Sequence, residues 1–527
     1  MPPDNYTNPV LGMDLGTTFS AVARWDGRGP EVYINAMGQN TTQSAVYYDR
    51  EHEEYLVGQI AHDRLLIDPS NGILGVKRLM DDRNHEIVLG GKVHSPVEIS
   101  GKILAKMYQD ICDMFPKGVF RSRGVVVTVP YYFRAHQCAN TQSAAEMAGL
   151  TVLGIVQEPV AASLAYALDM VNQNPYDERE ENILVFDLGG GTFDLTVFKL
   201  TQTKDLLVFE VLGTGGDDRL GGLDFDASLK DHITRQHGID LSSLTDLNRR
   251  IAEQSFTAAV MTAKERLSYT PTYALTVPNI PNKNGMHLAV DITRDEFEKS
   301  ISHYVANVAH VILQTCMDSN TLAAQKISRE EIGKLIDKEG LRGLSQFSLA
   351  NRISRVIKVG GSSKIPVFSH MLEILAGKDK VYGNINPSLC VAQGAAIFAA
   401  HLDDPSVLGR QVQIVARNSH ALGVELAGGM FYRLIDVNTK LPAKVTQIFT
   451  TDTDSQSELD VNVFQGSSRM ARDNSFVGSV HVGGLLPRPA GDLNIYITFE
   501  VNREQLVQVT IEERESGILK TQSLKYA

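Results

Sequence analysis

Two short segments of the sequence place carboxylates beside a glycine turn. Residues 183–198, ILVFDLGGGTFDLTVF, put Asp187 and Asp194 on either side of three consecutive glycines. Residues 11–25, LGMDLGTTFSAVARW, repeat the pattern with Asp14 ahead of a glycine and two threonines. A turn without side chains lets backbone N–H groups approach a phosphate, and a neighbouring carboxylate can hold the metal ion that accompanies it. An ordinary β-hairpin is the alternative interpretation of either turn taken alone.

Other motifs have the character of an α/β ligand site. Pro159 suits a first helical turn, which puts Glu158 at a strand-to-helix corner, where ligands of α/β proteins collect. Glycine pairs also occur in residues 216–226, GDDRLGGLDFD, and 356–366, VIKVGGSSKIP. The sequence contains no P-loop, no complete dinucleotide fingerprint and no G-x-S-x-G elbow. Two glycine hairpins with acidic residues remain, as needed to grip a nucleoside triphosphate between two lobes through Mg²⁺.

The elements expected around these motifs are those of a two-lobed α/β domain. The two hairpins lie roughly 170 residues apart, which predicts two related lobes that each begin with such a hairpin. Residues 124–133 read as a buried strand, and residues 135–150 and 249–268 as helices. Residues 329–352 look like a further amphipathic helical stretch. After residue 420 the pattern changes to short alternating strands with frequent turns, which predicts an all-β sandwich.

Composition excludes several other classes. The 527 residues carry a formal charge of −12, which argues against a nucleic-acid binder. The four cysteines lie far apart without a C-x-x-C pair, so neither a zinc site nor a disulfide framework is expected. No secretory signal and no long uninterrupted apolar run is evident, so we expect a cytoplasmic protein without a membrane partner.

Taken together, the motifs resemble the 70-kDa heat-shock chaperones, the DnaK family. The segments that carry the resemblance are GMDLGTTFS, VKRLM, VVVTVPYYF, VQEPVAASLAYALD, FDLGGGTFDLTVF, RLGGLDFD and VGGSSKIP, in this order and followed by the sandwich. The resemblance implies an α/β two-lobed actin-like ATPase domain over residues 8–402, an interdomain linker over 403–419 and an all-β sandwich domain that binds peptides over 420–527. Because the sequence ends just after the sandwich, we expect a member without the family's helical lid.

The resemblance also implies a function. It implies an ATP-dependent chaperone that hydrolyses ATP to control the binding of extended apolar segments of unfolded proteins, with a J-domain co-chaperone and a nucleotide exchange factor as partners. A nucleotide-sensing adaptor or scaffold with little turnover is the alternative. A small-molecule kinase on the same scaffold is disfavoured, because the sandwich supplies a peptide groove and not a sugar pocket. The implied cofactors are ATP or ADP and Mg²⁺, with K⁺ as an additional ion.

The site residues follow from the same resemblance. Implied catalytic residues are Lys77, Glu158, Asp187, Thr192 and Asp194. The implied metal-binding residues are Asp14, Glu158 and Asp187, which would hold Mg²⁺ largely through water. Implied nucleotide-binding residues are Gly16, Thr17, Thr18, Gly189, Gly190, Gly191, Gly222, Lys264, Ser268, Gly360, Gly361, Ser362 and Lys364. The implied residues of the peptide cleft are Val424, Ala427, Phe449, Leu459, Val461, Val477 and Ile495, for which sandwich core is the alternative.

The sequence departs from the family pattern at several places. Met261, Glu265 and Ser388 replace residues that usually contact or surround the adenosine, which implies altered gripping of the base. Cys138 stands where an arginine normally relays the signal from the switch proline, Pro130.

Other departures concern the coupling and the cleft. The linker reads RQVQIV in place of an acidic residue and a leucine run, which implies weaker docking. Asp452 occupies a loop position that is usually small and apolar, and residues 329–352 include an insertion of unknown role.

Overall fold

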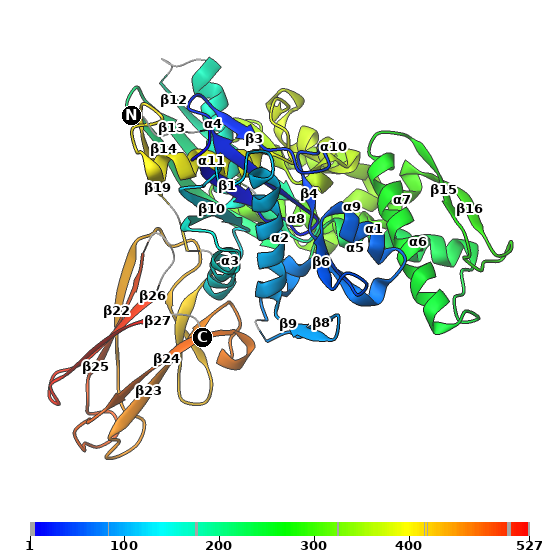
Figure 1. Ribbon diagram of the computed structural model, residues 1–527. Coiled ribbons are helices and arrows are strands. Elements are labelled where there is room, and N and C mark those ends of the chain that lie inside the picture. Colours follow the sequence, from blue (N-terminus) through cyan, green and yellow to red (C-terminus); the bar gives the residue numbers. More distant parts are fainter. Residues whose placement is uncertain are drawn as a thin grey trace.

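The computed structural model describes residues 6–82, 84–173, 178–323, 326–415, 417–418, 420–502 and 507–524. Its N-terminal part contains two β-sheets with helices around them (Figure 1), and each sheet has both parallel and antiparallel strand pairs. The first has the order β11-β10-β1-β2-β3, with β4 paired to β2. Its strands are β1 (Val10–Asp14), β2 (Phe19–Trp25), β3 (Pro30–Val32), β4 (Thr42–Gln43), β10 (Gly124–Val129) and β11 (Val152–Gln157).

The second sheet has the order β18-β17-β12-β13-β14-β19. Its strands are β12 (Arg179–Leu188), β13 (Phe193–Gln202), β14 (Leu206–Asp217), β17 (Arg355–Val359), β18 (Val381–Tyr382) and β19 (Gln411–Val415). Both sheets have the same plan. Each contains a meander of three antiparallel strands, β1-β2-β3 in the first sheet and β12-β13-β14 in the second. Two further strands, β10 and β11 or β17 and β18, continue each sheet from the first strand of its meander and run parallel to that strand. The related lobes expected from the repeated hairpin thus share their topology.

Two helices join the sheets into one core. They are α4 (Glu158–Gln173) and α11 (Cys390–Asp403), which pack against each other and against strands of the first sheet. One hydrophobic cluster contains Val126 of the first sheet, Phe198 of the second, Ala161 of α4 and Ala395 of α11. It also contains the only tryptophan of the chain, Trp25. The cluster therefore holds the two lobes together beneath the glycine hairpins.

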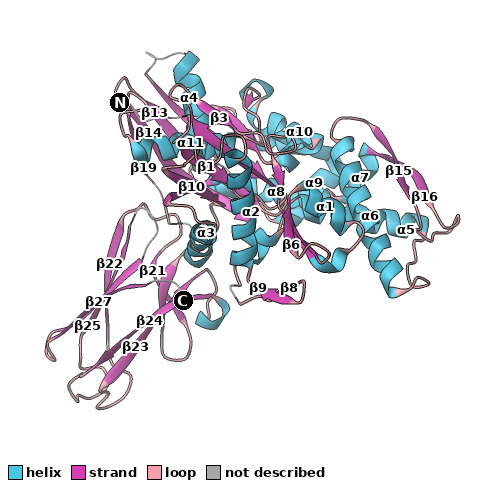
Figure 2. Cartoon of the chain, in the orientation of Figure 1, coloured by secondary structure: helices cyan, strands magenta, loops and turns pink. Residues whose placement is uncertain are grey.

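The remaining elements of this part are helices and short strands that lie around the two sheets or to one side of them, drawn in cyan and magenta in Figure 2. Around the first sheet lie the small strands and helices of residues 45–147: β5 (Ala45–Asp49), β6 (Glu54–Val57), β7 (Gly72–Leu74), β8 (Ile87–Leu89), β9 (Lys92–His94), α1 (Gln59–Leu65), α2 (Pro96–Cys112), α3 (Ala135–Met147), and the 3₁₀ helices η1 (Pro69–Asn71) and η2 (Val76–Leu79). Ser95 and Glu98 form a capping box at the start of α2, which satisfies free N–H groups of its first turn.

The later elements of this part are α5 (Gly222–His237), α6 (Asp246–Leu267), α7 (Arg294–Ser300), α8 (Ser302–Asp318), α9 (Arg329–Glu339) and α10 (Pro366–Ala376), with the hairpin β15 (Thr272–Val277) and β16 (Leu288–Thr293) and the 3₁₀ helices η3 (Gly340–Phe347), η4 (Gly361–Lys364) and η5 (Lys378–Lys380). Of these helices, α8 and α10 contact strands of the second sheet. The helices α5, α6 and α7 pack with one another and with the β15–β16 hairpin to one side of that sheet (Figure 1). The stretch 329–352 forms α9 and η3. Its residues Ile332, Leu344 and Leu349 are buried in the core of this lobe. This stretch is therefore an integral part of the lobe.

The C-terminal part is a sandwich of two four-stranded antiparallel sheets, with the orders β21-β20-β23-β24 and β22-β25-β26-β27. Its elements are β20 (Leu422–Glu425), β21 (Phe431–Ile435), β22 (Ala443–Phe449), β23 (Glu458–Gln465), η6 (Ala471–Asp473), β24 (Ser475–Gly483), β25 (Ile495–Val501), β26 (Val507–Glu513) and β27 (Ile518–Leu524). Alternate residues of β25 and β26 are buried, as the period of two predicts. Among the helices of the described residues, none is long and apolar enough to span a membrane.

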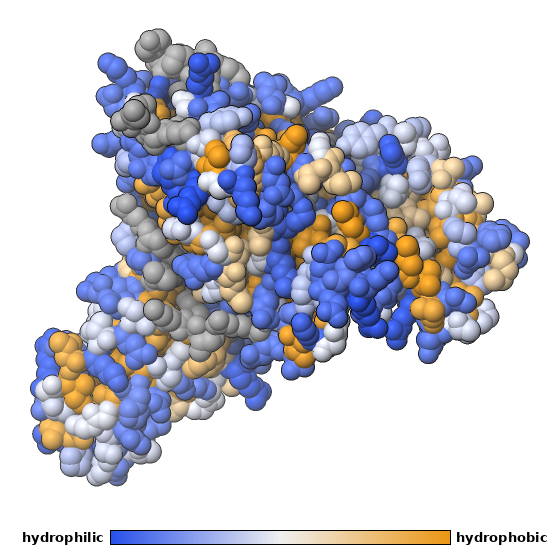
Figure 3. All heavy atoms as spheres, in the orientation of Figure 1, coloured by the Kyte–Doolittle hydropathy of each residue, from blue (hydrophilic) through white to orange (hydrophobic). Residues whose placement is uncertain are grey.

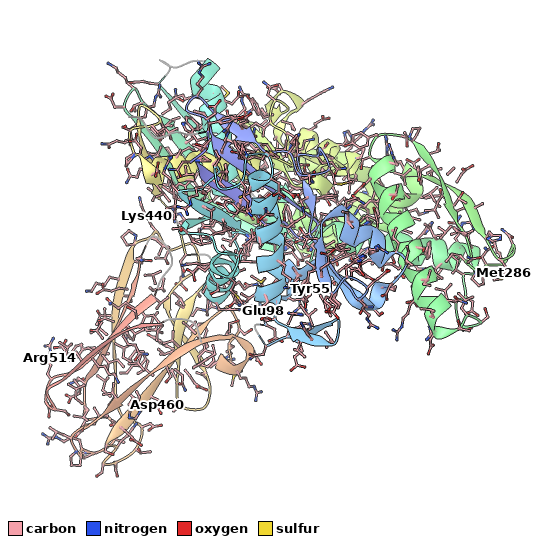
Figure 4. All side chains as sticks on the ribbon, viewed as in Figure 1. Tyr55, Glu98, Met286, Lys440, Asp460 and Arg514 are labelled. Carbon is pink, nitrogen blue, oxygen red and sulfur yellow. The ribbon has the colours of Figure 1, made fainter. Side chains whose placement is uncertain are left out.

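The expected linker is partly a strand. β19 pairs in parallel with β14, and Val412 and Ile414 pack against the core that the two lobes share. Residues 416 and 419 of the expected linker lie outside the described residues. Lys440 lies at the end of the sandwich nearest to the α/β part, whereas Asp460 and Arg514 lie away from it (Figure 4). The Lys440 ammonium group is 3.4 Å from the carboxylate of Glu210 on β14.

Candidate functional site

A cavity of about 340 Å³ lies where the turns of both sheets meet. Its walls come from the β1–β2 turn, the β12–β13 turn, η2, the start of α4, the C-terminal end of α6 and the loop through η4. Gly191, Asp194 and Gly222 of the expected site lie beside this lining. The expected site residues that line the cavity are Asp14, Gly16, Thr17, Thr18, Lys77, Glu158, Asp187, Gly189, Gly190, Thr192, Lys264, Ser268, Gly360, Gly361, Ser362 and Lys364.

The two glycine turns face each other at close range. A Cβ added to Gly190 would overlap the hydroxyl oxygen of Thr18, and one added to Gly191 would come within 2.8 Å of the Thr17 hydroxyl. No residue larger than glycine fits these positions without displacing a side chain of the opposite lobe. The threonines of the first lobe and the backbone of the second therefore converge on one point, which is the arrangement that suits a polyphosphate.

A lysine and two carboxylates form the floor beside these turns. The Lys77 ammonium group donates a hydrogen bond to Glu158 over 2.5 Å, and both residues are more than 90% buried. Burial acts to lower the pKa of Lys77, but the charges of Glu158 and Asp14 outweigh it and raise the pKa. Burial raises the pKa of Asp14 to about 7, with Glu158 adding to the shift and Lys77 opposing it. The lysine is thus a cation held in place by carboxylates.

Two further carboxylates, Asp187 and Asp194, are cross-strand partners on β12 and β13. Burial, reinforced by Glu158, raises the pKa of Asp187 well above its ordinary value and that of Asp194 to about 7. One oxygen of each carboxylate is buried without a hydrogen-bond partner. Unpaired acceptors in a crowded acidic pocket are costly, and a bound cation would relieve that cost.

This donor set fits Mg²⁺ bound largely through its waters. Carboxylate oxygens are the ligands that Mg²⁺ prefers, and the ion keeps several waters when it binds beside phosphates. Among the described residues, no three acidic, histidine or cysteine side chains are grouped closely enough to enclose a metal ion directly. The three expected Mg²⁺ ligands, Asp14, Glu158 and Asp187, all line the cavity.

The far end of the cavity is built on α6. The Lys264 ammonium group donates to the Gly222 carbonyl at 3.0 Å and to Asp226 at 2.8 Å. The Ser362 hydroxyl donates to the Gly189 carbonyl, which ties the η4 loop to the second glycine turn. The Lys364 ammonium group donates to the Ser388 hydroxyl at 2.9 Å.

Two residues that the sequence reasoning missed hold the second turn in position. Arg78 donates to the Gly191 carbonyl at 2.8 Å and forms an ion pair with Asp224 at 2.6 Å, so it spans the two lobes. The sequence offered one indication of this role, because Arg78 directly follows Lys77 in the motif VKRLM. The backbone N–H of Tyr132 donates to Asp194 at 3.3 Å, and nothing local in the sequence indicates this contact.

The segment after Pro130 also leads from this site to the sandwich. Besides the bond to Asp194, the Tyr132 ring meets His420 edge to face at 5.7 Å, and the Tyr131 hydroxyl donates to the Arg417 carbonyl. Arg417 in turn donates to the carbonyls of Val211 on β14 and Asn438 of the sandwich.

Cys138 does not take part in this path. It packs against the apolar cluster of Met80, Val129 and Phe133. Burial raises the pKa of its thiol to about 12, so the thiol stays uncharged near neutral pH. The path from Asp194 to the sandwich thus runs through the tyrosines and Arg417.

The expected peptide-cleft residues divide into two groups. Val424, Val461, Val477 and Ile495 are buried in the sandwich core. Phe449 and Leu459 are partly buried against that core and Ala427 is exposed. Phe449 packs edge to face with the exposed ring of Tyr432. Other apolar side chains of the sandwich are also exposed at its surface (Figure 3). Accessible apolar surface among these seven residues is therefore limited to the second group.

The fold and the cavity define a class: α/β proteins in which two related sheets bring opposed glycine turns and buried carboxylates to one cavity. The family model "Hsp70 protein" matches residues 10–89, 81–336 and 343–526. The chaperone protein DnaK from two strains of Halobacterium salinarum is 35% identical over 518 residues, which cover 96% of this chain and 73% of each relative. The chain belongs to the Hsp70 family.

Proposed function

We propose that this protein is an ATP-dependent chaperone in which the cavity between the lobes hydrolyses ATP to ADP and phosphate. The single observation that carries the proposal is the convergence, in a member of the Hsp70 family, of both glycine turns, Lys77 and the carboxylates of Asp14, Glu158 and Asp187 on one cavity, with Asp194 paired across the strands to Asp187. The alternative of an adaptor with little turnover is not favoured by the family relationship.

The proposed roles follow from position and charge. Backbone N–H groups of the two turns and the hydroxyls of Thr17, Thr18 and Thr192 bind the phosphates. When bound, Mg²⁺ would neutralise phosphate charge, and Asp14, Glu158 and Asp187 would hold it through its waters.

Lys77 and Asp194 have distinct proposed roles in the reaction. Lys77 stabilises the charge that develops on the transferred phosphoryl group. Asp194, which has an unpaired oxygen, orients the attacking water, with K⁺ as an additional ion nearby. Such positioning and charge are the main requirements for phosphoryl transfer.

Titration with Mg²⁺ tests this assignment. The Asp187→Asn variant should bind ADP in the absence of metal about as well as the wild type. Its hydrolysis should need a higher Mg²⁺ concentration, because one carboxylate of the metal site is lost. Asp231→Asn, which changes an exposed carboxylate on α5, serves as the matched control. An Asp187→Asn variant with an unchanged Mg²⁺ requirement would remove Asp187 from the metal site.

For the sandwich we propose that an extended apolar peptide binds at the surface formed by Ala427, Phe449 and Leu459. Val424, Val461, Val477 and Ile495 support this surface from below. Backbone pairing and alternate pockets are the general means of holding such a segment. The fluorescence anisotropy of a labelled apolar peptide should report weaker binding to Phe449→Ala than to Thr446→Ala, an exposed change on the same strand. Equal binding by both variants would place the groove elsewhere.

The domain bounds, the partner proteins and the cellular location are part of the same proposal. The ATPase domain spans residues 8–402, the linker 403–419 and the peptide-binding domain 420–527. A J-domain protein and a nucleotide exchange factor act as partners, and the protein works in the cytoplasm. Stimulation of hydrolysis by an added J-domain tests the first partner, and faster release of labelled ADP tests the second.

A further inference from the structure

The backbone carbonyl groups of the second glycine turn are all engaged by protein donors. The carbonyls of Gly189 and Gly190 accept from two backbone N–H groups in the first turn of α5, at 3.0 and 2.9 Å. These donors belong to the same lobe as the glycines. The Gly191 carbonyl is held differently, because among the described residues only Arg78 of η2 donates to it, over 2.8 Å. Since η2 belongs to the first lobe, this carbonyl is held from across the cavity.

The engaged carbonyls determine where the N–H groups of this turn point. In a planar trans peptide the C=O and N–H bonds point to opposite sides. The N–H groups that share a peptide with these carbonyls are those of Gly190, Gly191 and Thr192, and within the part of the chain that the structure describes none of them donates to a protein acceptor. Thr192 lines the cavity. By holding the Gly191 carbonyl, Arg78 therefore fixes the orientation of the Thr192 N–H group, which is left to donate to a ligand.

The Arg78 guanidinium is itself held by the second lobe. The nitrogen that donates to Gly191 also donates to the carboxylate of Asp224 on α5, over 2.6 Å. The same carboxylate oxygen accepts from the backbone N–H of Gly221 at 2.8 Å, just before α5 begins. The guanidinium lies directly against the turn, since a Cβ added to Gly191 would come within 2.8 Å of its Nε. Arg78 thus contacts the turn and α5 together, and it can do so only while the two lobes are closed on each other.

We propose that Arg78 is a positioning residue that makes the phosphate site depend on closure of the lobes: it holds the peptide group between Gly191 and Thr192 so that the Thr192 N–H group donates to a phosphate. This inference rests on the proposed function of the cavity. Lys77, the preceding residue of η2, donates to Glu158 on the floor of the cavity. The two consecutive side chains thus have different tasks, because Lys77 supplies charge and Arg78 orients the backbone of the opposite lobe. Opening of the lobes releases this peptide group, and the phosphate loses an oriented donor.

Calorimetric titrations of the full chain with ADP and with adenosine, both in the presence of Mg²⁺, test this role. Arg78→Met should weaken ADP binding by about 10- to 150-fold, the value of one hydrogen bond to a charged group. Adenosine carries no phosphate, so its affinity should not change, and its binding also shows that the variant is folded. Arg78→Lys should keep most of the ADP affinity, because a single nitrogen of Arg78 contacts both acceptors and an ammonium group can take its place. Arg235→Met, which removes an exposed arginine of α5, is the matched control.

A double-mutant cycle tests whether the ion pair with Asp224 holds Arg78 in place. Asp224→Asn keeps an acceptor for the Gly221 N–H group but removes the charge that holds the guanidinium. It should lower the ratio of ADP affinity to adenosine affinity in the same direction as Arg78→Met. The double variant should lose no more than Arg78→Met alone, because both changes remove one arrangement. Losses that add up in the double variant would overturn the role of the ion pair.

The positioning role and the proposed function fail in different ways. Arg78→Met that binds ADP as Arg235→Met does, or that loses ADP and adenosine affinity equally, would overturn the positioning role. A loss of ADP affinity in Arg78→Lys as large as in Arg78→Met would overturn it as well. In these cases the wild-type chain still binds ADP, and the proposed function stands. If the wild-type chain binds no ADP, the proposed nucleotide site itself fails.

Discussion

Replacing Asp194 by asparagine should make the nucleotide-free protein more stable while it removes activity. Asp194 is 1% exposed, and its pKa of about 7 means that folding at neutral pH buries a charge that the site leaves partly unpaired. A carboxyl whose pKa is raised on folding binds more protons in the folded state, so stability falls as the pH rises from about 4 to about 7. Asparagine is uncharged throughout this range and avoids that loss.

The magnitude follows from the pKa. The free energy of unfolding of the wild type falls with pH only below the folded pKa of Asp194, which is about 7. Of the interval from pH 5.5 to pH 8, about 1.5 pH units lie below this pKa, and each unit costs about 1.36 kcal/mol. The stability of Asp194→Asn relative to the wild type should therefore increase by about 2 kcal/mol over this interval. Comparing the two pH values cancels the cost of the new amide N–H group, which is about 1–3 kcal/mol if it finds no acceptor.

The assay is urea unfolding in EDTA without nucleotide, followed by the fluorescence of Trp25. This residue is the only tryptophan and lies in the core shared by both lobes, so it reports the unfolding of the part that contains Asp194. Asp231→Asn, an exposed change, should show no such pH dependence relative to the wild type. The reasoning is refuted if Asp194→Asn and the wild type lose stability in parallel as the pH rises, or if the variant retains full ATP hydrolysis.

Two further predictions concern the glycine turns and the interdomain path. Gly190→Ala should lower the rate of single-turnover hydrolysis at least tenfold, because the added methyl group overlaps the Thr18 hydroxyl and separates the turns. The control is Gly383→Ala, which should have no effect because its methyl group meets no atom within 4 Å. Equal rates for the two variants would contradict the opposed-turn geometry. Arg417→Ala should leave basal hydrolysis intact but reduce its stimulation by peptide, since its hydrogen bonds join β14 to the sandwich; unchanged stimulation in a peptide titration would rule out this path.

The sequence predicted those parts of the site that are local. An apolar run, a glycine turn and a second apolar run specify a hairpin, so Asp187 and Asp194 could be placed opposite each other before the fold was known. Pro159 likewise locates Glu158 at a helix start, as found for α4. In each case the information lies within a few residues of the feature it specifies.

Contacts between distant segments could not be predicted in this way. Arg78 and Asp224 are 146 residues apart, and only the closure of the two lobes brings them together. The peptide cleft shows a related limit. Alternation identifies Val461 and Val477 as inward-facing, but it does not distinguish a groove from a core, and both are buried in the sandwich core. The pairing of β19 with β14 also depends on a distant edge strand that the linker sequence does not reveal.

Single-turnover hydrolysis of ATP with Mg²⁺, comparing the wild type with Lys77→Ala, tests the central claim most directly. Lys77 is buried at 2.5 Å from Glu158, and loss of one such charge-stabilising group typically costs about 100- to 1,000-fold in rate. The account predicts a loss of this size while ADP still binds, with wild-type hydrolysis accelerated by an apolar peptide. Hydrolysis by Lys77→Ala at the wild-type rate would contradict the account.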